Sequence, residues 1–558
     1  MIVTKITSSL EKIFADEKPV SYPVLKELTA LKGERVSIQY MFTYDANGSD
    51  YLNGVIRVEP KFSGTLAKYI HSVRDIYQVP VVKTVNWEMG GIDGNYLRTA
   101  PGLFPDVLTP LQFGGKISIH RDVLSAIWIE FRLPEDIDAG DYDLKIELDA
   151  EDAGKCENTF TLSVINATLP KEDIYFTQWF HSDCLADYYH VPAWSEEHWR
   201  IVENFARVAA ENGITMLLTP IFTPPLDTAV GGERTTVQLL DITKDGNKYT
   251  FDFSRLARWI DMCDRVGIKY FEIAHLFTQW GAAHAPKIMA TENGEYKKIF
   301  GWETDSTGEE YTAFLRQLLT ELLAFMKKGG NDKRCFFHIS DEPHLDHLDK
   351  YRAARDAVKD ILAGYPIMDA LSDFDFYKLG VIDNPIPATN HIKPFLEANV
   401  PHLWTYYCMG QNINVSNRFH SMPAWRNRSI GMQFFKFNIE GFLQWGYNFY
   451  NNQRSSDMIN PYLECGANLI FTGGDCFSVY PAHDGTALES ARIIVFHEAL
   501  QDVKAMKLCE SLYGHERVVM EIEKVLGDEL TFERCAYSSH EMLLVRRRIN
   551  EMIREKVS

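Results

Sequence analysis

The spacing of hydrophobic and polar positions changes near residue 168, and this change separates two kinds of expected structure. Before it, short runs of β-branched and aromatic residues, such as 117–119 and 126–131, are separated by clusters of Gly, Asp, Asn and Pro. Apolar residues then alternate with polar ones over 142–148. Such alternation buries one face of a strand and leaves the other in water, so residues 1–168 are predicted to form an antiparallel β-sandwich.

After residue 168, apolar runs alternate with amphipathic segments. Helical spacing appears in 196–211, 255–266 and 311–328, and a glycine stops each of the first two. The expected strands are 175–181, 214–220, 268–275, 335–340, 366–371, 386–390, 401–409 and 441–450. Eight strand-plus-helix units are typical of a (β/α)8 barrel.

The expected fold class is therefore α/β plus all-β, with an N-terminal β-sandwich followed by a (β/α)8 TIM-like barrel. The tail beyond residue 480 has helical and then mixed patterning. We expect three domains: a sandwich at 1–168, a catalytic barrel at 169–480 and a small C-terminal extension at 481–558 that packs on the barrel. The sandwich is expected to brace the barrel, and a carbohydrate-binding module is the alternative for it.

The expected fourth strand ends in two adjacent acids. Residues 335–343 read CFFHISDEP, so Asp341 and Glu342 follow an apolar run and precede a proline that cannot continue the ladder. In a barrel the carboxyl ends of the strands carry the chemistry. Two partly desolvated acids in this place oppose each other's ionisation, which indicates catalysis. The alternative is that Asp341 caps a helix beginning near His344 and Glu342 is merely solvated.

The adjacency of the two acids restricts the mechanism. In an ordinary retaining glycosidase two carboxyl groups face each other across the bond at roughly 5 Å, whereas strand neighbours point to opposite faces. If the strand bends at its end, Asp341 and Glu342 lie along one side of a sugar ring instead. Glu342 then protonates the leaving oxygen, and Asp341 addresses a substituent on the next carbon. A 2-acetamido group in that position supplies its own carbonyl oxygen as the nucleophile.

Three motifs in order along the chain support a family resemblance. They are Ser340-Asp341-Glu342-Pro343, the turn from Pro134 to Gly140-Asp141-Tyr142, and residues 474–481 continuing through Asp484-Gly485 and Ser490-Ala491-Arg492. With these motifs the chain resembles glycoside hydrolase family 123, β-N-acetylgalactosaminidases built as a β-sandwich followed by a (β/α)8 barrel.

The resemblance implies a retaining exo-β-N-acetylgalactosaminidase that acts through an oxazoline-type intermediate. Its substrate would be a glycan or glycolipid with a terminal β-linked N-acetylgalactosamine. Asp341 would orient and stabilise the acetamido group, and Glu342 would be the general acid/base. Two alternatives stay open: a β-N-acetylhexosaminidase of other specificity, and a catalytically silent sugar-binding barrel. The presence of both acids favours an enzyme.

Further candidate substrate contacts come from other expected strand ends. They are Trp404, Tyr406 and Tyr407 on strand seven, Trp445 and Tyr447 on strand eight, and His181, Asp183 and His275 on strands one and three. Aromatic rings there can stack on a sugar, and the polar groups can bind hydroxyls. The alternative for each ring is packing between barrel and helix, which strand alternation assigns to about half of them.

Composition restricts the partners and the compartment. The net charge of −20 disfavours nucleic acid and anionic membranes as partners. No apolar window has the length of a membrane span, and the first residues lack the core of a signal peptide. The nine cysteines are scattered without a C-x-x-C pair, which favours reduced thiols and a cytoplasmic location.

The sequence also lacks the common metal and nucleotide motifs. It has no HExxH helix, GxGxxG or P-loop. Residues 344–347, HLDH, contain ligand-type side chains but are expected to form a solvated first helical turn. We therefore expect neither a metal nor a cofactor.

Overall fold

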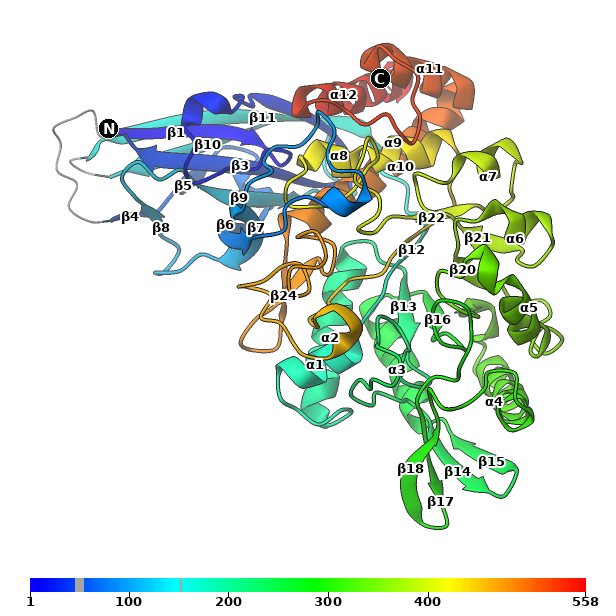
Figure 1. Cartoon of the computed structure of the whole chain (residues 1–558). Helices are drawn as coiled ribbons and strands as arrows, with labels where there is room; N and C mark the ends of the chain where they lie inside the picture. Colours follow the sequence, from blue (N-terminus) through cyan, green and yellow to red (C-terminus); the bar gives the residue numbers. More distant parts are fainter. Residues whose placement is uncertain (46–54, 151–152, 558) are drawn as a thin grey trace.

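A computed structural model describes residues 1–45, 55–150 and 153–557. Its N-terminal part contains a five-stranded and a four-stranded sheet (Figure 1). The first has the order β1 (Ile2–Ser8), β3 (Arg35–Tyr44), β9 (Ser125–Arg132), β6 (Ile70–Val81), β7 (Gly102–Pro110). The second has the order β2 (Glu27–Lys32), β11 (Lys155–Thr168), β10 (Gly140–Asp149), β5 (Lys61–Ser63). A short pair, β4 (Ile56–Val58) and β8 (Ile117–Ile119), lies beside them.

The two sheets share one hydrophobic core. Ile38 and Ile127 from the first sheet belong to the same buried cluster as Leu144 and Leu162 from the second. In β10 every second residue from Leu144 to Leu148 is buried, as the alternating pattern predicts. Most strand pairs are antiparallel, but β2 and β11 run parallel.

The second part is built on a six-stranded parallel sheet. Its order is β19 (Cys335–Phe336), β16 (Tyr270–Ile273), β13 (Met216–Thr219), β12 (Tyr175–Gln178), β23 (Gly441–Gln444), β22 (Trp404–Tyr406). The remaining two expected strands, β20 (Met368–Ala370) and β21 (Asn384–Ile386), form a separate parallel pair. Single parallel bridges, Phe337 with Ile367 and Ala388 with Tyr406, lie between this pair and the larger sheet.

The regular sheet is smaller than the pattern predicts because several strands leave the ladder early. β19 keeps only two ladder residues. Beyond it the backbone N–H of Ile339 donates to the side-chain carboxylate of Asp369 on β20 rather than to a backbone carbonyl. Asp369 belongs to the buried charged network described below.

Amphipathic helices cover the outside of the sheet. Those along the chain are α1 (Ser182–Tyr188), α2 (Glu196–Glu211), α3 (Ser254–Val266), α4 (Glu309–Lys328), α5 (Leu348–Asp356), α6 (Phe374–Lys378), α7 (Lys393–Glu397), α8 (Ala424–Arg428) and α9 (Ile430–Lys436). The Ser195 side chain caps α2 by accepting from the N–H of His198. Gly267 ends α3 at φ +94°, where a side chain would be strained.

Two features were not expected from the sequence pattern. The segments after β13 and β16 form a four-stranded sheet of two hairpins, seen at the bottom of Figure 1. Its strands are β14 (Asp241–Asp245), β15 (Lys248–Asp252), β17 (Ile288–Glu292) and β18 (Glu295–Phe300). The tail begins with a short hairpin, β24 (Val479–Pro481) and β25 (Ala487–Glu489), before α10 (Ala491–Tyr513), α11 (His515–Leu526) and α12 (Ser539–Val557).

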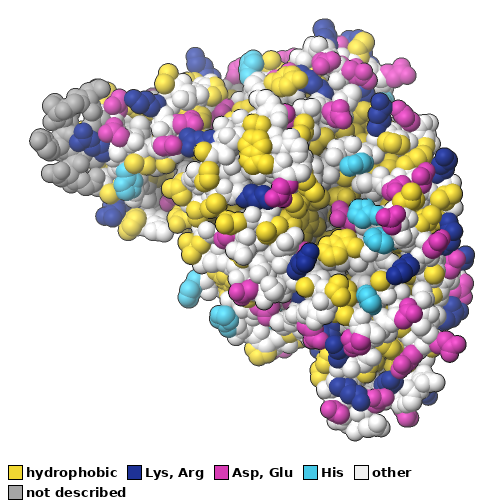
Figure 2. All heavy atoms as spheres, viewed as in Figure 1, with side chains coloured by type: hydrophobic (Ala, Val, Ile, Leu, Met, Phe, Trp, Pro, Cys, Tyr) yellow, Lys and Arg dark blue, Asp and Glu magenta, His cyan; other side chains and the backbone are white. Residues whose placement is uncertain are grey.

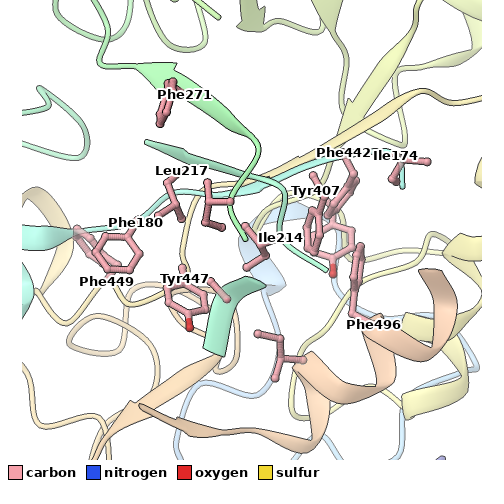
Figure 3. Packing of buried hydrophobic residues seen from close by; sticks show 14 of the residues in the cluster. Ile174, Phe180, Ile214, Leu217, Phe271, Tyr407, Phe442, Tyr447, Phe449 and Phe496 are labelled. Atoms are coloured by element: carbon pink, nitrogen blue, oxygen red, sulfur yellow. The ribbon is translucent and has the colours of Figure 1, made fainter. Parts of the chain in front are cut away.

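One large hydrophobic core contains residues from the N-terminal sheets, the parallel sheet and α10. Phe104 and Trp128 of the N-terminal sheets belong to the same buried cluster as Phe176 of β12 and Phe496 of α10. Phe176 stacks on Phe496 with ring centroids 4.8 Å apart, and Figure 3 shows Phe496 near Phe442 of β23.

The nine cysteines are all unpaired. Among the described residues, no helix has the length and apolar character needed to cross a membrane.

Candidate active site

The chain bends sharply where Asp341 and Glu342 follow β19. Glu342 has φ +43°, a left-handed backbone conformation that side-chain-bearing residues seldom adopt. Its N–H donates to the Ala370 carbonyl at 3.1 Å, which fixes the bend against β20. The following helical turn is capped by His344, so the alternative that Asp341 is a helix N-cap is wrong. The acids are therefore not alternating neighbours on a regular strand.

Glu342 is partly exposed and is held by a tyrosine from β22. The Tyr406 hydroxyl donates to Oε1 of Glu342 at 2.7 Å. Burial, followed by the negative charge of Glu342, raises the pKa of Tyr406 well above its ordinary value. The phenol therefore stays protonated, and Tyr406 lies beside the acid pair.

Asp341 is also partly exposed and is packed beside the loop that follows β16. Its carbonyl accepts from the N–H of Trp280 at 2.9 Å. The Ser340 hydroxyl donates to the Thr278 carbonyl at 2.8 Å, which holds the same loop at the end of β19. Burial and then the charge of Glu342 raise the pKa of Asp341 well above the usual range of a carboxyl group.

A buried charged network lies behind the acid pair. Nε2 of His338 is 2.7 Å from Glu272, and Nδ1 is 3.1 Å from Asp369. Asp369 also accepts from the Tyr351 hydroxyl at 2.6 Å, and Glu272 accepts from Trp179 Nε1 at 2.7 Å. Burial opposes the charged form of His338, but its hydrogen bonds to both carboxylates raise its pKa to about 10. At neutral pH it is a buried imidazolium between two acids.

The same network contains the nearest approach to a metal-ligand set among the described residues. His275, His338 and Asp369 place possible ligand atoms within 4.8 Å of one another. The rings of His275 and His338, however, are stacked 4.2 Å apart at 19°. Imidazole nitrogens bind metals in the plane of the ring, so two nearly parallel stacked rings cannot both direct a nitrogen at one ion. The geometry therefore does not favour a metal here.

Trp445 follows β23, and a hydrogen bond to an acidic side chain holds its indole ring. Its Nε1 donates to Oδ2 of Asp475 at 3.0 Å, and its ring packs against Phe449 and Phe471. Trp445 remains partly exposed. Burial raises the pKa of Asp475 to about 7, and the charge of Glu342 contributes. Asp475 thus links this tryptophan electrostatically to the acid pair.

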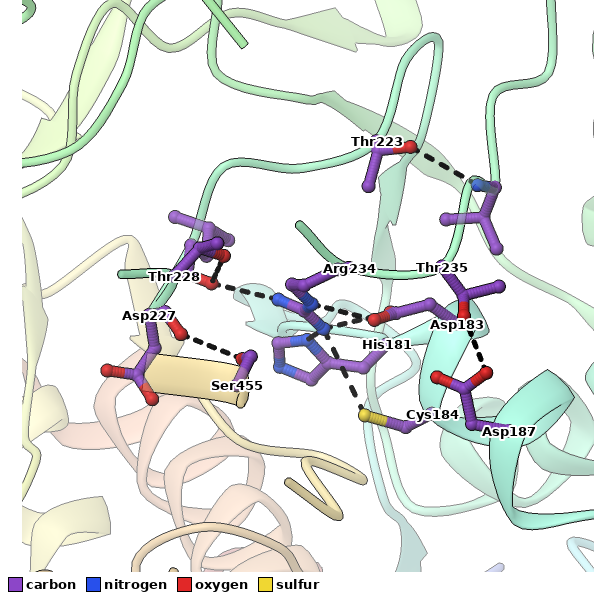
Figure 4. Close-up of polar contacts among 12 residues, drawn as sticks. His181, Asp183, Cys184, Asp187, Thr223, Asp227, Thr228, Arg234, Thr235 and Ser455 are labelled. Atoms are coloured by element: carbon purple, nitrogen blue, oxygen red, sulfur yellow. Dashed lines mark hydrogen bonds and ion pairs between the residues drawn. The ribbon is translucent and has the colours of Figure 1, made fainter. Parts of the chain in front are cut away.

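His181 and Asp183 are buried in a different polar cluster (Figure 4). Arg234 donates to both oxygens of Asp183, at 2.6 and 2.8 Å, and to Nδ1 of His181 at 3.0 Å. Arg234 also donates to the Leu226 carbonyl at 2.9 Å, so the cluster anchors the loop after β13. That loop carries Asp227, whose charge contributes to the raised pKa of Asp341. The structure therefore places His181 and Asp183 in the cluster that anchors the loop after β13.

Three predicted rings lie away from the acid pair. Trp404 begins rather than ends β22, and it stacks on Tyr175 at the start of β12, so its expected position is wrong. Tyr407 donates to Asn427 of α8 at 3.2 Å, and Tyr447 donates to the Phe205 carbonyl of α2 at 2.8 Å. Both lie in the core between strands and helices, as Figure 3 shows.

His275 is fully buried in the interior of the sheet, with its ring against Trp179 and His338. Burial lowers its pKa far below the ordinary histidine value, so it is neutral.

Of the candidates from sequence, the structure brings Asp341, Glu342, Tyr406 and Trp445 together. It also adds Glu272, His338, Asp369 and Asp475, which the sequence analysis did not select. An acid inside the apolar run at 268–275 was the available signal for Glu272.

Comparisons with known proteins identify the family of the chain. The sequence profile of the glycoside hydrolase 123 catalytic domain matches residues 179–509. Among solved structures, a family 123 glycoside hydrolase from Clostridium perfringens, described for glycolipid glycan hydrolysis, has a TM-score of 0.75 at 15% identity. That likeness covers 100% of this chain and 99% of the other.

Another solved glycoside hydrolase has a lower structural similarity to this chain. A family 39 glycoside hydrolase from Bacteroides cellulosilyticus covers 88% of this chain and 83% of its own, at 10% identity and a TM-score of 0.33. No curated protein is significantly similar in sequence. The profile match spans the strands and loops that carry the acid pair, Tyr406 and Trp445. The chain therefore belongs to glycoside hydrolase family 123.

Proposed function

We propose that this glycoside hydrolase is a retaining exo-β-N-acetylgalactosaminidase that uses the 2-acetamido group of its substrate as the nucleophile. The observation that carries the proposal is the adjacency of Asp341 and Glu342 on a backbone bent at φ +43°. The bend allows both carboxyl groups to address one side of a sugar ring. Opposed carboxylates across the glycosidic bond are not needed when the substrate supplies the attacking oxygen.

In the first step the acetamido oxygen attacks the anomeric carbon, and the glycosidic C–O bond breaks. Glu342 gives its proton to the departing oxygen, and the product is a cyclic oxazoline-type intermediate. The ring nitrogen gains positive charge, which its N–H presents to Asp341. In the second step water attacks the anomeric carbon, Glu342 accepts the water proton, and the acetamido group reopens. The configuration at the anomeric carbon is therefore retained.

The electrostatics of the pair suit this division of roles. Burial, followed by the negative charge of Glu342, raises the pKa of Asp341, so the site disfavours a free carboxylate at Asp341. An acetamido N–H bound beside Asp341 would donate to the Asp341 carboxylate and favour its charged form. Tyr406 donates to one oxygen of Glu342, at 2.7 Å, and leaves the other oxygen for the proton.

We also infer that the eight parallel strands form one (β/α)8 barrel. The bridges Phe337–Ile367 and Ala388–Tyr406 support this closure, because they lie between β19 and β20 and between β21 and β22. The proposed domains remain a sandwich at 1–168, a barrel at 169–480 and an extension at 481–558.

The nine unpaired cysteines support the proposed cytoplasmic location.

One assay tests the substrate class. Chromogenic β-N-acetylgalactosaminide, β-N-acetylglucosaminide and β-galactoside substrates are hydrolysed side by side. We expect the first to be turned over fastest and the plain galactoside to be nearly inert, because it lacks the nucleophile. A preference for the glucosaminide identifies a hexosaminidase of other specificity. Brisk hydrolysis of the galactoside contradicts substrate assistance, and binding without hydrolysis of any substrate indicates a silent sugar-binding barrel.

A further inference from the structure

A segment from the N-terminal sheets reaches the proposed active site. Residues 82–98 are the first part of the connection between β6 and β7, and they lie against the loop that follows β22. Asn86 Nδ2 donates to the Met409 carbonyl at 3.3 Å. Asn412 Nδ2 donates to the carbonyls of Asn86 and Gly91 at 3.2 and 3.0 Å. This loop begins directly after Tyr406, the residue that holds Glu342.

The same segment also contacts the loop that follows β23. The N–H of Gly473 donates to the Lys83 carbonyl at 2.9 Å, and Lys83 Nζ donates to the Ile470 carbonyl at 2.6 Å. Gly473 lies two residues before Asp475, which holds Trp445. Residues 82–98 therefore contact both the loop that follows Tyr406 and the loop that carries the Trp445–Asp475 pair.

The tip of this segment exposes apolar side chains. Trp87 is 66% exposed and Met89 is 51% exposed. A Cβ on Gly91, which has φ +86°, would lie 3.2 Å from two carbons of the Trp87 ring. The six-membered ring of the Trp87 indole thus lies close to Gly91. On the face shown in Figure 2, hydrophobic side chains surround a hollow between the sandwich part and the larger part of the molecule.

We propose that Trp87 is a stacking platform for the sugar ring on the leaving-group side of the scissile bond. The inference rests on the proposed function and extends it, because it gives the sandwich a direct part in substrate choice. A flat ring that lies close to Gly91 and is exposed to solvent matches the apolar face of a pyranose. The neighbouring Glu88, whose side chain is 83% exposed, can accept hydrogen bonds from sugar hydroxyls. A carboxylate there and a net charge of −20 disfavour a lipid surface as the occupant.

Two substrates with the same terminal sugar isolate this contact. One is β-N-acetylgalactosaminyl fluoride, whose leaving group is a single atom. The other is a disaccharide in which N-acetylgalactosamine is β-linked to galactose. The variant Trp87→Ala is compared with the wild type and with Phe113→Ala, which removes a ring that is 55% exposed on the distant β7–β8 connection.

For Trp87→Ala we expect KM for the disaccharide to rise about 3–10-fold, the size of one aromatic stacking contact, with kcat/KM for the fluoride unchanged. Trp87→Phe should recover part of the loss, and Phe113→Ala should behave as wild type. Equal losses on both substrates, or no loss on the disaccharide, overturn the inference. So does Trp87-dependent binding to phosphatidylcholine vesicles with unchanged disaccharide kinetics. A wild-type enzyme inactive on the fluoride overturns the proposed function itself, and this inference with it.

Discussion

Glu342 has the features that a general acid/base requires. Its side chain is partly exposed, its backbone is fixed through Ala370, and one carboxylate oxygen is held by Tyr406. A carboxyl group with one oxygen held and one free presents its proton in a single direction. The proton transfer proposed for Glu342 would therefore need no repositioning of its side chain when substrate arrives.

Replacing Glu342 with Gln should reduce kcat by about 10²–10⁴-fold, the usual contribution of general acid–base catalysis. The melting temperature should stay near that of the wild type, because glutamine keeps the shape and can still accept from Tyr406. Substrates with very acidic leaving groups should lose less. Glu295→Gln, at an exposed position of β18, is the matched control and should be fully active. Full activity of the Glu342 variant on a natural linkage would remove this residue from the mechanism.

Asp341→Asn should weaken catalysis and also the binding of a thiazoline analogue of the cyclic intermediate. The analogue binds by the interactions that stabilise the intermediate, and the variant removes the counter-charge for its nitrogen. Inhibition constants measured for both proteins check the prediction. Trapping of a 2-fluoro sugar as an ester on any Asp or Glu would show that an enzyme carboxylate, rather than the acetamido group, is the nucleophile.

His338 is expected to make the stability of the folded protein decrease as the pH becomes alkaline. Its pKa in the folded protein is about 10, above the ordinary 6.5, so its contribution is fully present below pH 6.5 and is lost as pH rises through 10. His338→Gln should therefore lower the melting temperature at pH 7 and reduce its decline between pH 7 and 10. His402→Gln, at an exposed ring beside Glu440, is the control. An unchanged pH profile in the His338 variant contradicts the assignment of a buried imidazolium.

At the scale of single elements, β22 and β23 show what the pattern predicted and where it failed. Along β22 and into the next residue alternation holds, because Trp404 and Tyr406 belong to one buried cluster while Tyr407 belongs to the core beneath the helices. The sequence predicted the strand but not its ends, so it did not show that Trp404 and Tyr406 lie at different levels. β23 ends at Gln444, and beyond it alternation no longer applies. Trp445 and Tyr447 accordingly have different surroundings despite their spacing of two.

The acid pair could be selected as a candidate from the sequence because its signal is local, whereas the buried network behind it could not. Adjacent acids after an apolar run stand out in the sequence. Glu272 lies on β16, Asp369 lies on β20, and His338 follows β19, so only the folded chain shows that their charges meet. Likewise, the hydrogen bond of Ile339 to Asp369 replaces a ladder contact that strand patterning assumes.

Trp445→Ala and Tyr447→Ala separate a substrate contact from a packing contact on the same element. The Trp445 variant should raise KM while the protein still melts cooperatively near its normal temperature. The Tyr447 variant should reduce the free energy of unfolding by about 3–5 kcal/mol, because it opens a cavity in a fully buried site. Kinetics and thermal melts run together check both. A large stability loss with unchanged KM for Trp445→Ala would assign that ring to the core.

At the scale of the molecule, the sandwich and the larger part are joined more closely than a boundary near residue 168 indicates. Arg35 and Arg74 of the first sheet both pair with Glu489 of β25. Asp106 of β7 accepts from Arg492 of α10 through both carboxylate oxygens, each at 2.9 Å. Buried charges that find their partners across a boundary favour cooperative unfolding of both parts. Sequence patterning assigns elements but does not pair charges hundreds of residues apart.

Asp106→Asn tests this coupling. Burial opposes ionisation of Asp106, but Arg492 and His420 hold its pKa far below the ordinary 3.8. Its contribution to stability is therefore present above pH 3.8 and is lost as pH falls further. The variant leaves Arg492 buried without its partner, which should cost about 3–5 kcal/mol at pH 7 and make the remaining stability less sensitive to acid.

Urea unfolding followed between pH 3 and 7 measures both effects, and Asp16→Asn is the control. Asp16 pairs with Arg98 at 2.7 Å, but its side chain is 72% exposed, so its loss should cost only about 0–1 kcal/mol. If the ion pair of Asp106 couples the two parts, its loss should separate one transition into two, with the sandwich unfolding apart from the barrel. A single transition with unchanged midpoint would show that the shared hydrophobic core, rather than the buried charges, holds the two parts together.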